Sequence, residues 1–471
     1  MKNIFKFLLI FCVSLAFVAC EDAYNVDPGD EILEENAITN VDDVQRAING
    51  IYASISGSNI VSWSSRISDD LRLSPENRGQ GVTVHTWNVV SGTVEVEALW
   101  DNMYNVISSV NRLLSVIDDI PTVTPEDEAF ITRVKAECYA VRAMSHFDLL
   151  RLFSTDLLDE AALGVPIVDA VTVYGQPSRD TVGDVFEFIN NDLNMAYTML
   201  DPSYTDNTRF TQLAVRALQA RVALYSGDYD NAIDYSTDVI QASSLATVEE
   251  YPAIWTDASD AEVLFKLART TGDGAIGTIF RDTNGDTFFN MSNEMLDFIF
   301  NNGWTNDIRT FSLIDVDNFD PEAPLVGKYL GTSANYGLND VKLFRTSEQY
   351  LIRAEAYVRS DNPQLGLAAD DIATIKTVRN VNGTPAIVNF SNESIALESI
   401  LNERRMELGY EGHRFFDLKR FGQDITRTPE DCALASGACE LSNSSYIFTL
   451  PIPQSELFAN DNMVPNPGYG N

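Results

Sequence analysis

The spacing of hydrophobic positions along this chain is predominantly helical. In residues 41–55, apolar side chains recur every three or four positions, from Val41 and Val44 to Ile48, Ile51 and Ile55. This is the period at which one face of an α-helix is buried. Further amphipathic stretches predict long helices at residues 99–117, 129–153 and 181–200, the last with Thr181 as its candidate N-cap. A mainly α-helical chain is therefore expected.

Two later stretches each combine a pair of helical patterns with a short polar turn. In residues 209–242 the turn lies at Gly227, and Ala232 marks a close approach of two helices, as in a tetratricopeptide repeat. Residues 347–380 have the same helix–turn–helix rhythm, and residues 402–422 with the helix before them form a third, less regular pair. Such repeats stack into a superhelix that serves mechanics or recognition rather than chemistry.

Residues 56–94 and 245–345 interrupt this helical rhythm. The second segment is rich in Gly, Asp, Asn and Pro and contains β-like runs such as residues 261–267. Long irregular insertions commonly carry recognition. We therefore predict a mainly α fold, a tetratricopeptide-like helical superhelix whose irregular, partly β insertions form a ligand-binding subdomain. The expected boundaries are a helical region at 41–244 containing the 56–94 insertion, a ligand-binding insertion at 245–345, and a C-terminal helical region at 346–471.

The first 19 residues have the pattern of a removable leader. Lys2 and Lys6 precede an almost wholly apolar run from Phe7 to Phe17, and the segment closes at Cys20. An apolar run of this length is too short to span a bilayer as a helix. A cysteine at the cleavage point resembles the lipobox of bacterial lipoproteins, which predicts lipid attachment at Cys20 and an acidic tether over residues 20–40. An ordinary secretory signal with a chance cysteine is the alternative.

The composition is strongly acidic. The chain has 69 Asp and Glu against 32 Lys and Arg, a formal net charge of −37 at pH 7. Loss of Lys2 and Lys6 with the leader would lower the charge from −37 to −39. A surface of this sign repels phosphate backbones, so nucleic acid is excluded as an expected partner.

Four cysteines remain after the leader. Cys138 lies in a helical pattern, whereas Cys432 and Cys439 bracket a short loop containing glycine. Outside the cytoplasm, two cysteines seven positions apart in a loop are expected to pair as a disulfide. A zinc site is the alternative, but it would require further ligands nearby, and the sequence supplies none.

The most charged stretch is residues 402–422. On a helix, Arg404 falls in the middle of an apolar stripe, with Glu403 and Glu407 along one edge, and Asp417 follows a glycine turn. A buried arginine must be paired, so these four residues are expected to form a structural ion-pair network. Arg404→Ala is expected to cost about 3–5 kcal/mol, and Glu407→Gln to be milder.

The same stretch also suggests catalytic carboxylates, or a metal site at Glu403, Glu407 and His413. General acid catalysis needs a carboxyl with a raised pKa, whereas the adjacent arginines lower carboxyl pKa values and compete with a metal ion. No His-Glu-x-x-His, Gly-x-Ser-x-Gly or phosphate-loop motif is present. No catalytic residue and no metal site are therefore predicted.

Residues 403–422, "ERRMELGYEGHRFFDLKRFG", resemble the C-terminal hallmark of the SusD/RagB family of Bacteroidetes outer-membrane lipoproteins. Other family-like stretches occur in order along the mature chain, at residues 99–114, 134–154, 350–362 and 450–469. The departures are mild: His146 stands where aromatics are common, and only Glu21 and Asp22 follow the lipidated cysteine.

The resemblance implies a binding protein rather than an enzyme. Family members cap a SusC-like TonB-dependent transporter, capture oligosaccharides (or peptides in the RagB branch) and deliver them. The expected location is the outer membrane, lipid-anchored and facing the cell exterior. The expected partners are the transporter, an oligosaccharide or polysaccharide, and the membrane through the anchor. A surface glycosidase and a pure repeat scaffold without a small ligand are the other classes considered.

A glycan site needs aromatic rings beside polar side chains. Trp63 and Trp304 lie in irregular, polar surroundings and are the first candidates, with Trp87 and Tyr336 second. The candidate hydrogen-bonding residues beside them are Arg66, Asp70 and Asn306. The alternative for each tryptophan is that it fills a core under a loop. No cofactor is expected, although residues 282–287 and 315–322 hint at structural calcium; a turn is favoured, since neither has an EF-hand's terminal Glu.

Overall fold

The computed structural model describes residues 37–172, 174–303 and 305–470. The leader, Cys20 and most of the acidic tether lie outside these ranges, as does Trp304. None of the helices in the described ranges has the length and apolarity needed to cross a membrane.

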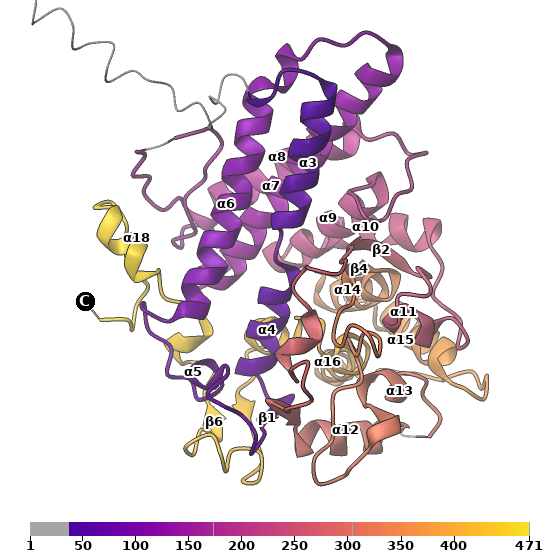
Figure 1. The fold of residues 1–471 in the computed structure, drawn as a ribbon. Helices are drawn as coiled ribbons and strands as arrows, with labels where there is room; N and C mark the ends of the chain where they lie inside the picture. The colour runs from indigo at the N-terminus through magenta and orange to yellow at the C-terminus, as the bar shows by residue number, and fades with distance from the viewer. Residues whose placement is uncertain (1–36, 173, 304, 471) are drawn as a thin grey trace, which may run out of the picture.

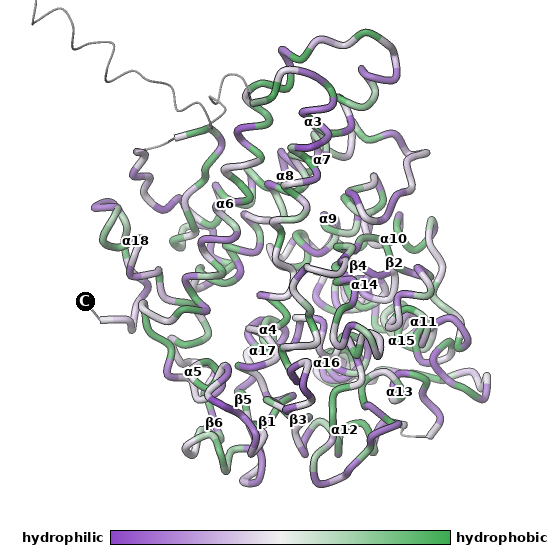
Figure 2. The backbone as a smooth tube through the Cα atoms, in the orientation of Figure 1, coloured by the Kyte–Doolittle hydropathy of each residue, from purple (hydrophilic) through white to green (hydrophobic). Residues whose placement is uncertain are grey.

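Long helices build the N-terminal region. They are α3 (Val41–Ser54), α4 (Gly57–Ile67), α5 (Val82–His85), α6 (Val94–Val116), α7 (Pro125–Phe153) and α8 (Val182–Met199), with a 3-10 turn at Ile117–Asp119. Helices α3, α6, α7 and α8 pack side by side (Figure 1). Helix α7 begins where Thr124 and Asp127 cap each other's backbone N–H groups around Pro125, a strong helix start. Along α6, hydrophobic and hydrophilic positions follow one another as an amphipathic helix requires (Figure 2), whereas the second half of α7 is buried on almost every side.

The helix pairs expected from the sequence are present. They are α9 (Gln212–Ser226) with α10 (Tyr229–Ala242), and α14 (Thr346–Arg359) with α15 (Leu365–Arg379), followed by α16 (Glu393–Leu408), α17 (Arg414–Phe421) and α18 (Gln454–Ala459). Gly227 ends α9 with a φ of 78°, which favours glycine. Helix α10 packs against α14, so the two pairs are neighbours in space despite their separation in sequence. The predicted mainly α, repeat-like fold is confirmed.

Short strands and helices form the insertions and part of the C-terminal region. The strands are β1 (Leu71–Leu73), β2 (Val263–Leu267), β3 (Phe289–Met291), β4 (Val341–Arg345), β5 (Ile425–Thr426) and β6 (Glu440–Leu441). The helices between them are α11 (Tyr251–Trp255), α12 (Asn293–Gly303) and α13 (Thr310–Leu313), with 3-10 turns at Ile276–Ile279, Val316–Asn318 and Tyr446–Phe448. Three antiparallel pairs form: β1–β3, β2–β4 and β5–β6. Leu71 lies opposite Met291, so β1–β3 joins the two insertions.

The first insertion is less irregular than expected. Residues 57–67 form α4, in which Ile60, Trp63 and Ile67 recur at helical spacing with Ser64 on the same face. Ser64 is buried, and its hydroxyl oxygen accepts a hydrogen bond from the backbone N–H of Phe415 at 3.1 Å. A buried hydroxyl that is hydrogen-bonded costs little, so polar side chains can occupy the buried face of this helix.

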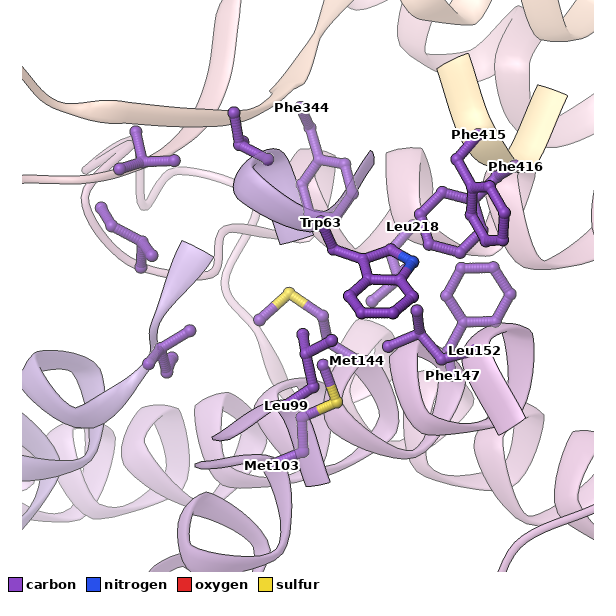
Figure 3. Close-up of a cluster of buried hydrophobic side chains, with 14 of the residues drawn as sticks. Trp63, Leu99, Met103, Met144, Phe147, Leu152, Leu218, Phe344, Phe415 and Phe416 are labelled. Atoms are coloured by element: carbon purple, nitrogen blue, oxygen red, sulfur yellow. The ribbon is translucent and has the colours of Figure 1, made fainter. Parts of the chain in front are cut away.

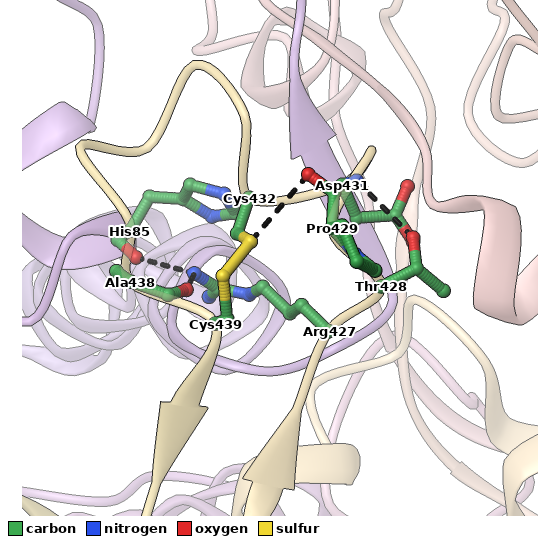
Figure 4. Close-up of a disulfide and its surroundings, with 8 residues drawn as sticks. All are labelled: His85, Arg427, Thr428, Pro429, Asp431, Cys432, Ala438 and Cys439. Atoms are coloured by element: carbon green, nitrogen blue, oxygen red, sulfur yellow. Dashed lines mark hydrogen bonds between the residues drawn. A yellow bond between two sulfur atoms is a disulfide. The ribbon is translucent and has the colours of Figure 1, made fainter.

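A disulfide loop holds the two sides of the insertion region together. Cys432 and Cys439 are bonded, and in Figure 4 Arg427 lies beside them. The Arg427 guanidinium donates to the backbone carbonyl of the last residue of α5 at 2.7 Å. The Asp431 carboxylate accepts from the backbone N–H of the first residue of α12 at 2.7 Å. The loop therefore connects α5 to the start of α12. Among the cysteines in the described ranges, Cys138 is free and buried in α7.

Candidate functional site

Both first-insertion tryptophans are core residues. Trp63 is 2% exposed and packs edge-on against Phe415, with ring centroids 6.5 Å apart (Figure 3). Trp87 is 8% exposed, donates its ring N–H to the Ile67 carbonyl at 2.9 Å, and lies under the Arg427 guanidinium at 4.4 Å. The expectation that these rings face a ligand is therefore wrong. Beside Trp63, Ser64 and Ser65 are themselves buried.

Asp70 is also internal and not a ligand contact. Its carboxylate accepts from Arg405 Nε at 2.8 Å, and the side chain is almost fully buried. Arg66 is half-buried, places its guanidinium 5.5 Å from the Phe289 ring, and leaves Nε without a hydrogen-bond partner. Tyr336 is half-buried, with the Arg281 guanidinium 5.4 Å from its ring. Arg66 and Tyr336 thus remain accessible, but the structure does not join them to Trp63.

Asn306 is the predicted residue that lies in a groove. Its backbone carbonyl accepts from Val381 N–H at 2.9 Å, and its side-chain oxygen accepts from the Asn382 amide at 2.9 Å. The adjacent Asp307 pairs with Asn380 in an isolated antiparallel bridge. These bonds fix the segment after α12 against the turn that follows α15, which forms one wall of the groove.

We call this cavity the amide groove, since four of its lining residues are asparagines. It has a volume of about 390 Å³ and lies between α12, α15 and α16. Its lining comprises Phe298, Asn302, Asn306, Asp307, Arg309, Lys376, Asn380, Ala386, Ile395, Glu398, Ser399, Asn402, Glu403 and Met406. Asn302, Asn306 and Asn402 are exposed, whereas Phe298 is half-buried. Amide side chains each donate and accept hydrogen bonds, the chemistry that matches a hydroxyl-rich ligand.

The floor of the amide groove is an ion-pair network. Arg309 Nη1 contacts Glu403 Oε1 at 2.5 Å, and Lys376 Nζ lies 3.3 Å from the other oxygen of Glu403. Arg309 also donates to Asp307 at 2.6 Å. Glu403 and Arg309 are 3% and 2% exposed. Because these charges neutralise one another, the floor is a rigid support rather than a set of free charges.

Glu407 lies at the centre of this network and joins the second insertion to α16. Its carboxylate accepts from three buried guanidiniums, those of Arg309 at 3.2 Å, Arg345 at 2.8 Å and Arg379 at 3.0 Å. Although burial alone would raise the pKa of Glu407, these arginines hold it well below its ordinary value. A carboxyl that stays ionised cannot act as a general acid.

The other two residues of the expected network are paired separately. Arg404 Nε donates to Asp417 Oδ2 at 2.8 Å, and both side chains are buried. The Arg404–Asp417 pair links α16 to α17, and Asp417 also accepts from Arg420, within α17, at 3.1 Å. The structure therefore places Glu403, Glu407, Arg404 and Asp417 in buried ion pairs, as a structural network requires. His413, considered as a metal ligand, is buried in the same region.

The acidic turns considered for calcium are closed by their own backbone. Asp282 Oδ1 accepts from the N–H groups of Asn284 at 2.8 Å and Asp286 at 2.9 Å. Asp315 similarly accepts from Asn318 N–H at 3.3 Å. Side chains that cap a turn in this way need no ion to order them. Within the described part of the chain, no group of three or more His, Cys, Asp or Glu side chains is placed to hold a metal ion.

Sequence reasoning missed most of the amide groove. Phe298 and Asn302 come from α12, Lys376 comes from α15, and Glu398 and Asn402 come from α16. The one available signal was the spacing of Glu398 and Asn402, four residues apart on the polar face of a helix. That pattern is typical of any solvated helix, so it did not single out a site.

Comparison with known proteins identifies the family. Residues 30–224 match the family model described as starch-binding associating with outer membrane, and residues 325–469 match that of the SusD family. SusD-like protein P38 of Formosa agariphila is 23% identical over 489 residues, covering 90% of this chain and 92% of its own length. Starch-binding protein SusD of Bacteroides thetaiotaomicron is 33% identical over 136 residues, 29% of this chain and 23% of that protein.

Solved structures agree with the sequence matches. A SusD superfamily protein from Bacteroides thetaiotaomicron superimposes with a TM-score of 0.79 at 28% identity, covering 91% of this chain and all of its own. A SusD superfamily protein from Bacteroides vulgatus gives a TM-score of 0.79 at 27% identity, covering 92% of this chain and 100% of its own. With family matches in both halves and the same fold throughout, the chain belongs to the SusD/RagB family.

Proposed function

We propose that this protein captures oligosaccharides at the bacterial outer membrane and binds them in the amide groove. The observation that carries the proposal is the groove itself, where exposed asparagines from α12, α16 and the segment between α12 and α13 line a cavity of about 390 Å³. The family matches support the class of ligand, because one model is described as starch-binding and one relative is named a starch-binding protein.

The groove combines the two kinds of surface that a sugar presents. Asn302, Asn306 and Asn402 supply donors and acceptors for hydroxyl groups. Phe298 and Ile395 supply apolar area for a ring face, and Ile395 is 46% exposed. Each hydrogen bond to a hydroxyl replaces one to water, so affinity is expected to be modest, with a dissociation constant between roughly micromolar and millimolar.

Loss of the Asn402 amide should weaken glycan binding by about fivefold, the worth of one neutral hydrogen bond. The measurement is calorimetry of wild type and Asn402→Ala against maltoheptaose, laminarihexaose and a mixed tryptic peptide pool, with product analysis after incubation. Asn190→Ala, an exposed asparagine on α8, is the matched control and should bind like wild type. Binding of peptides but of no glycan would show that the ligand is a peptide. Cleavage of a glycan would show that the protein is an enzyme. Equal glycan affinity in wild type and Asn402→Ala would show that the binding site is not the amide groove.

The proposal extends to an anchor and a partner. Lipid on Cys20 would hold the protein at the membrane, and each buried methylene of the acyl chains adds about 0.8 kcal/mol to anchoring. A SusC-like transporter in the same membrane would receive the cargo from this protein acting as its lid.

Cys20→Ala should shift the protein from the membrane fraction to the soluble fraction of cells that express it. Wild-type protein solubilised in mild detergent should co-purify with a TonB-dependent transporter, whereas the Cys20→Ala protein recovered from the soluble fraction should not. Persistence of the Cys20→Ala variant in membranes would refute the anchor, and purification of wild type without any transporter would refute the partnership.

A further inference from the structure

A second, smaller cavity lies at the junction of α7, α9, α10, α14 and α17. We call it the basic pocket; its volume is about 140 Å³ and it shares no residue with the amide groove. It is lined by Arg151, Thr155, Asp156, Leu157, Leu158, Leu224, Tyr225, Tyr229, Arg359, Phe416, Lys419 and Arg420. Four cationic side chains and one acidic side chain therefore face a single small cavity, in a protein whose net charge is −37.

The cations of the basic pocket are incompletely paired. Arg151 bonds Asp148 at 2.7 Å, Arg359 bonds Glu355 at 2.8 Å, and Arg420 bonds both Glu355 and Asp417. Lys419 donates to two backbone carbonyl oxygens at the end of α7, at 2.9 and 3.3 Å. Among the residues that the structure describes, no carboxylate forms an ion pair with Lys419. A largely buried ammonium held by neutral acceptors leaves positive charge without a counter-charge.

Two further polar atoms in this pocket lack hydrogen bonds. Among the described residues, the Tyr225 hydroxyl and the Arg420 Nε are buried and have no hydrogen-bond partner. The Arg420 guanidinium lies 4.6 Å from the Tyr225 ring, so the two residues that carry these atoms are in contact in the pocket lining. Buried polar groups are normally satisfied, and two orphan donors beside an unpaired ammonium indicate an absent acceptor.

The pKa values of Glu355 and Lys419 agree with a positive electrostatic potential in the basic pocket. Although burial opposes ionisation, Arg420, Arg359 and Arg404 lower the pKa of Glu355 to about 2. Burial lowers the pKa of the Lys419 ammonium to about 7, with only the exposed Asp156 opposing that shift. An anion entering the pocket would restore the charged form of Lys419.

We propose that the basic pocket binds an organic carboxylate with a short apolar body. Its oxygens would accept hydrogen bonds from Lys419, Arg420 Nε and the Tyr225 hydroxyl, all of which are donors. Its apolar body would lie against the leucines of the lining, Leu157, Leu158 and Leu224. The size of the cavity limits the guest to a few heavy atoms, which either a free small acid or an acidic side chain of another polypeptide can present.

The test is a saturation-transfer NMR titration of the full mature protein with sodium butyrate, using butyramide as the neutral isostere. Butyrate should bind saturably in the millimolar range, and butyramide at least about tenfold more weakly, since charge-assisted bonds are the stronger. Lys419→Met should weaken butyrate binding by about tenfold or more. Lys135→Met, which removes the lysine paired with Asp118 at the other end of α7, is the matched control and should leave it unchanged.

A second variant guards against a folding defect in Lys419→Met. Leu158 is 66% exposed at the pocket, so Leu158→Glu should fold normally and fill the site with its own carboxylate. A blocked peptide, acetyl-Leu-Glu-Leu-amide, then distinguishes the two sources. Competition by the peptide with butyrate assigns the site to a polypeptide partner, and no competition assigns it to a free acid. Equal binding of butyrate and butyramide, no saturable butyrate signal, or wild-type affinity in both Lys419→Met and Leu158→Glu would overturn the proposal.

Discussion

Replacement of Glu407 by Gln should destabilise this protein by about 3–5 kcal/mol, or prevent it from folding, because it leaves buried positive charge without its counter-charge. The Glu407 carboxylate is fully buried and is shared by three guanidiniums, those of Arg309, Arg345 and Arg379. A glutamine side chain can accept hydrogen bonds from one or two of them but carries no charge. Two of these arginines belong to the second insertion and its last strand, so the whole insertion is expected to loosen from α16.

Urea unfolding followed by circular dichroism measures this effect. Glu398→Gln, on the exposed face of the same helix, removes an equal charge and should unfold like wild type. Wild-type stability in a folded Glu407→Gln variant would show that the network does not hold the fold.

The structure reverses the order of stability costs that the sequence suggested for Arg404→Ala and Glu407→Gln. Arg404→Ala was expected to cost more than Glu407→Gln, because Arg404 occupies the middle of the apolar stripe of α16. In the fold, Arg404 pairs with Asp417, which retains Arg420 as a second partner. Three arginine side chains bond to the two carboxylate oxygens of Glu407. Removing this carboxylate therefore leaves more buried charge unpaired than removing Arg404 does. Helical periodicity placed both side chains inside but carried no information on which distant arginines would meet them.

Local pattern was sufficient for most of the scaffold. The period of Val44, Ile48 and Ile51 gave α3, and the polar turn at Gly227 gave the α9–α10 pair. The exception, α4, lies in a segment expected to be irregular, although Ile60, Trp63 and Ile67 recur there at helical spacing. Four serines interrupt this short pattern, and the contact of Ser64 with the backbone N–H of Phe415 in α17 joins residues far apart in sequence.

The binding surface was harder to predict than the scaffold, because it too depends on contacts between residues far apart in sequence. Tryptophans in polar sequence were taken as exposed, yet Ser65, Asp69 and Asp70 beside Trp63 are themselves buried. Asp69 is held by Arg414 at 2.6 Å and Asp70 by Arg405 at 2.8 Å, both from the C-terminal region. Asn306, predicted as a hydrogen-bonding residue, is exposed in the amide groove, but the residues beside it come from helices on either side. Because three helices line the amide groove, the sequence of no single helix shows a pattern that identifies it.

Trp63→Ala should cost about 3–5 kcal/mol of folding free energy, the cost of emptying a large aromatic site in a packed core. The Trp63 ring is surrounded by Leu99, Met103, Met144, Phe147, Leu152, Leu218, Phe415 and Phe416, which come from α6, α7, α9 and α17 (Figure 3). Four helices meet at this side chain, so they cannot all move inward to fill the space that it leaves. The indole N–H has no hydrogen-bond partner, so the loss is one of packing alone.

Trp63→Phe is the control that separates packing from any contact with a ligand. It keeps an aromatic ring against Phe415 and should recover more than half of the lost stability, whereas a ligand-stacking tryptophan would leave stability unchanged in both variants. Oligosaccharide binding by the folded fraction of either variant should match wild type, because Trp63 does not line the amide groove. Unchanged urea midpoints together with lost oligosaccharide binding would place Trp63 at the ligand and contradict its position in the core.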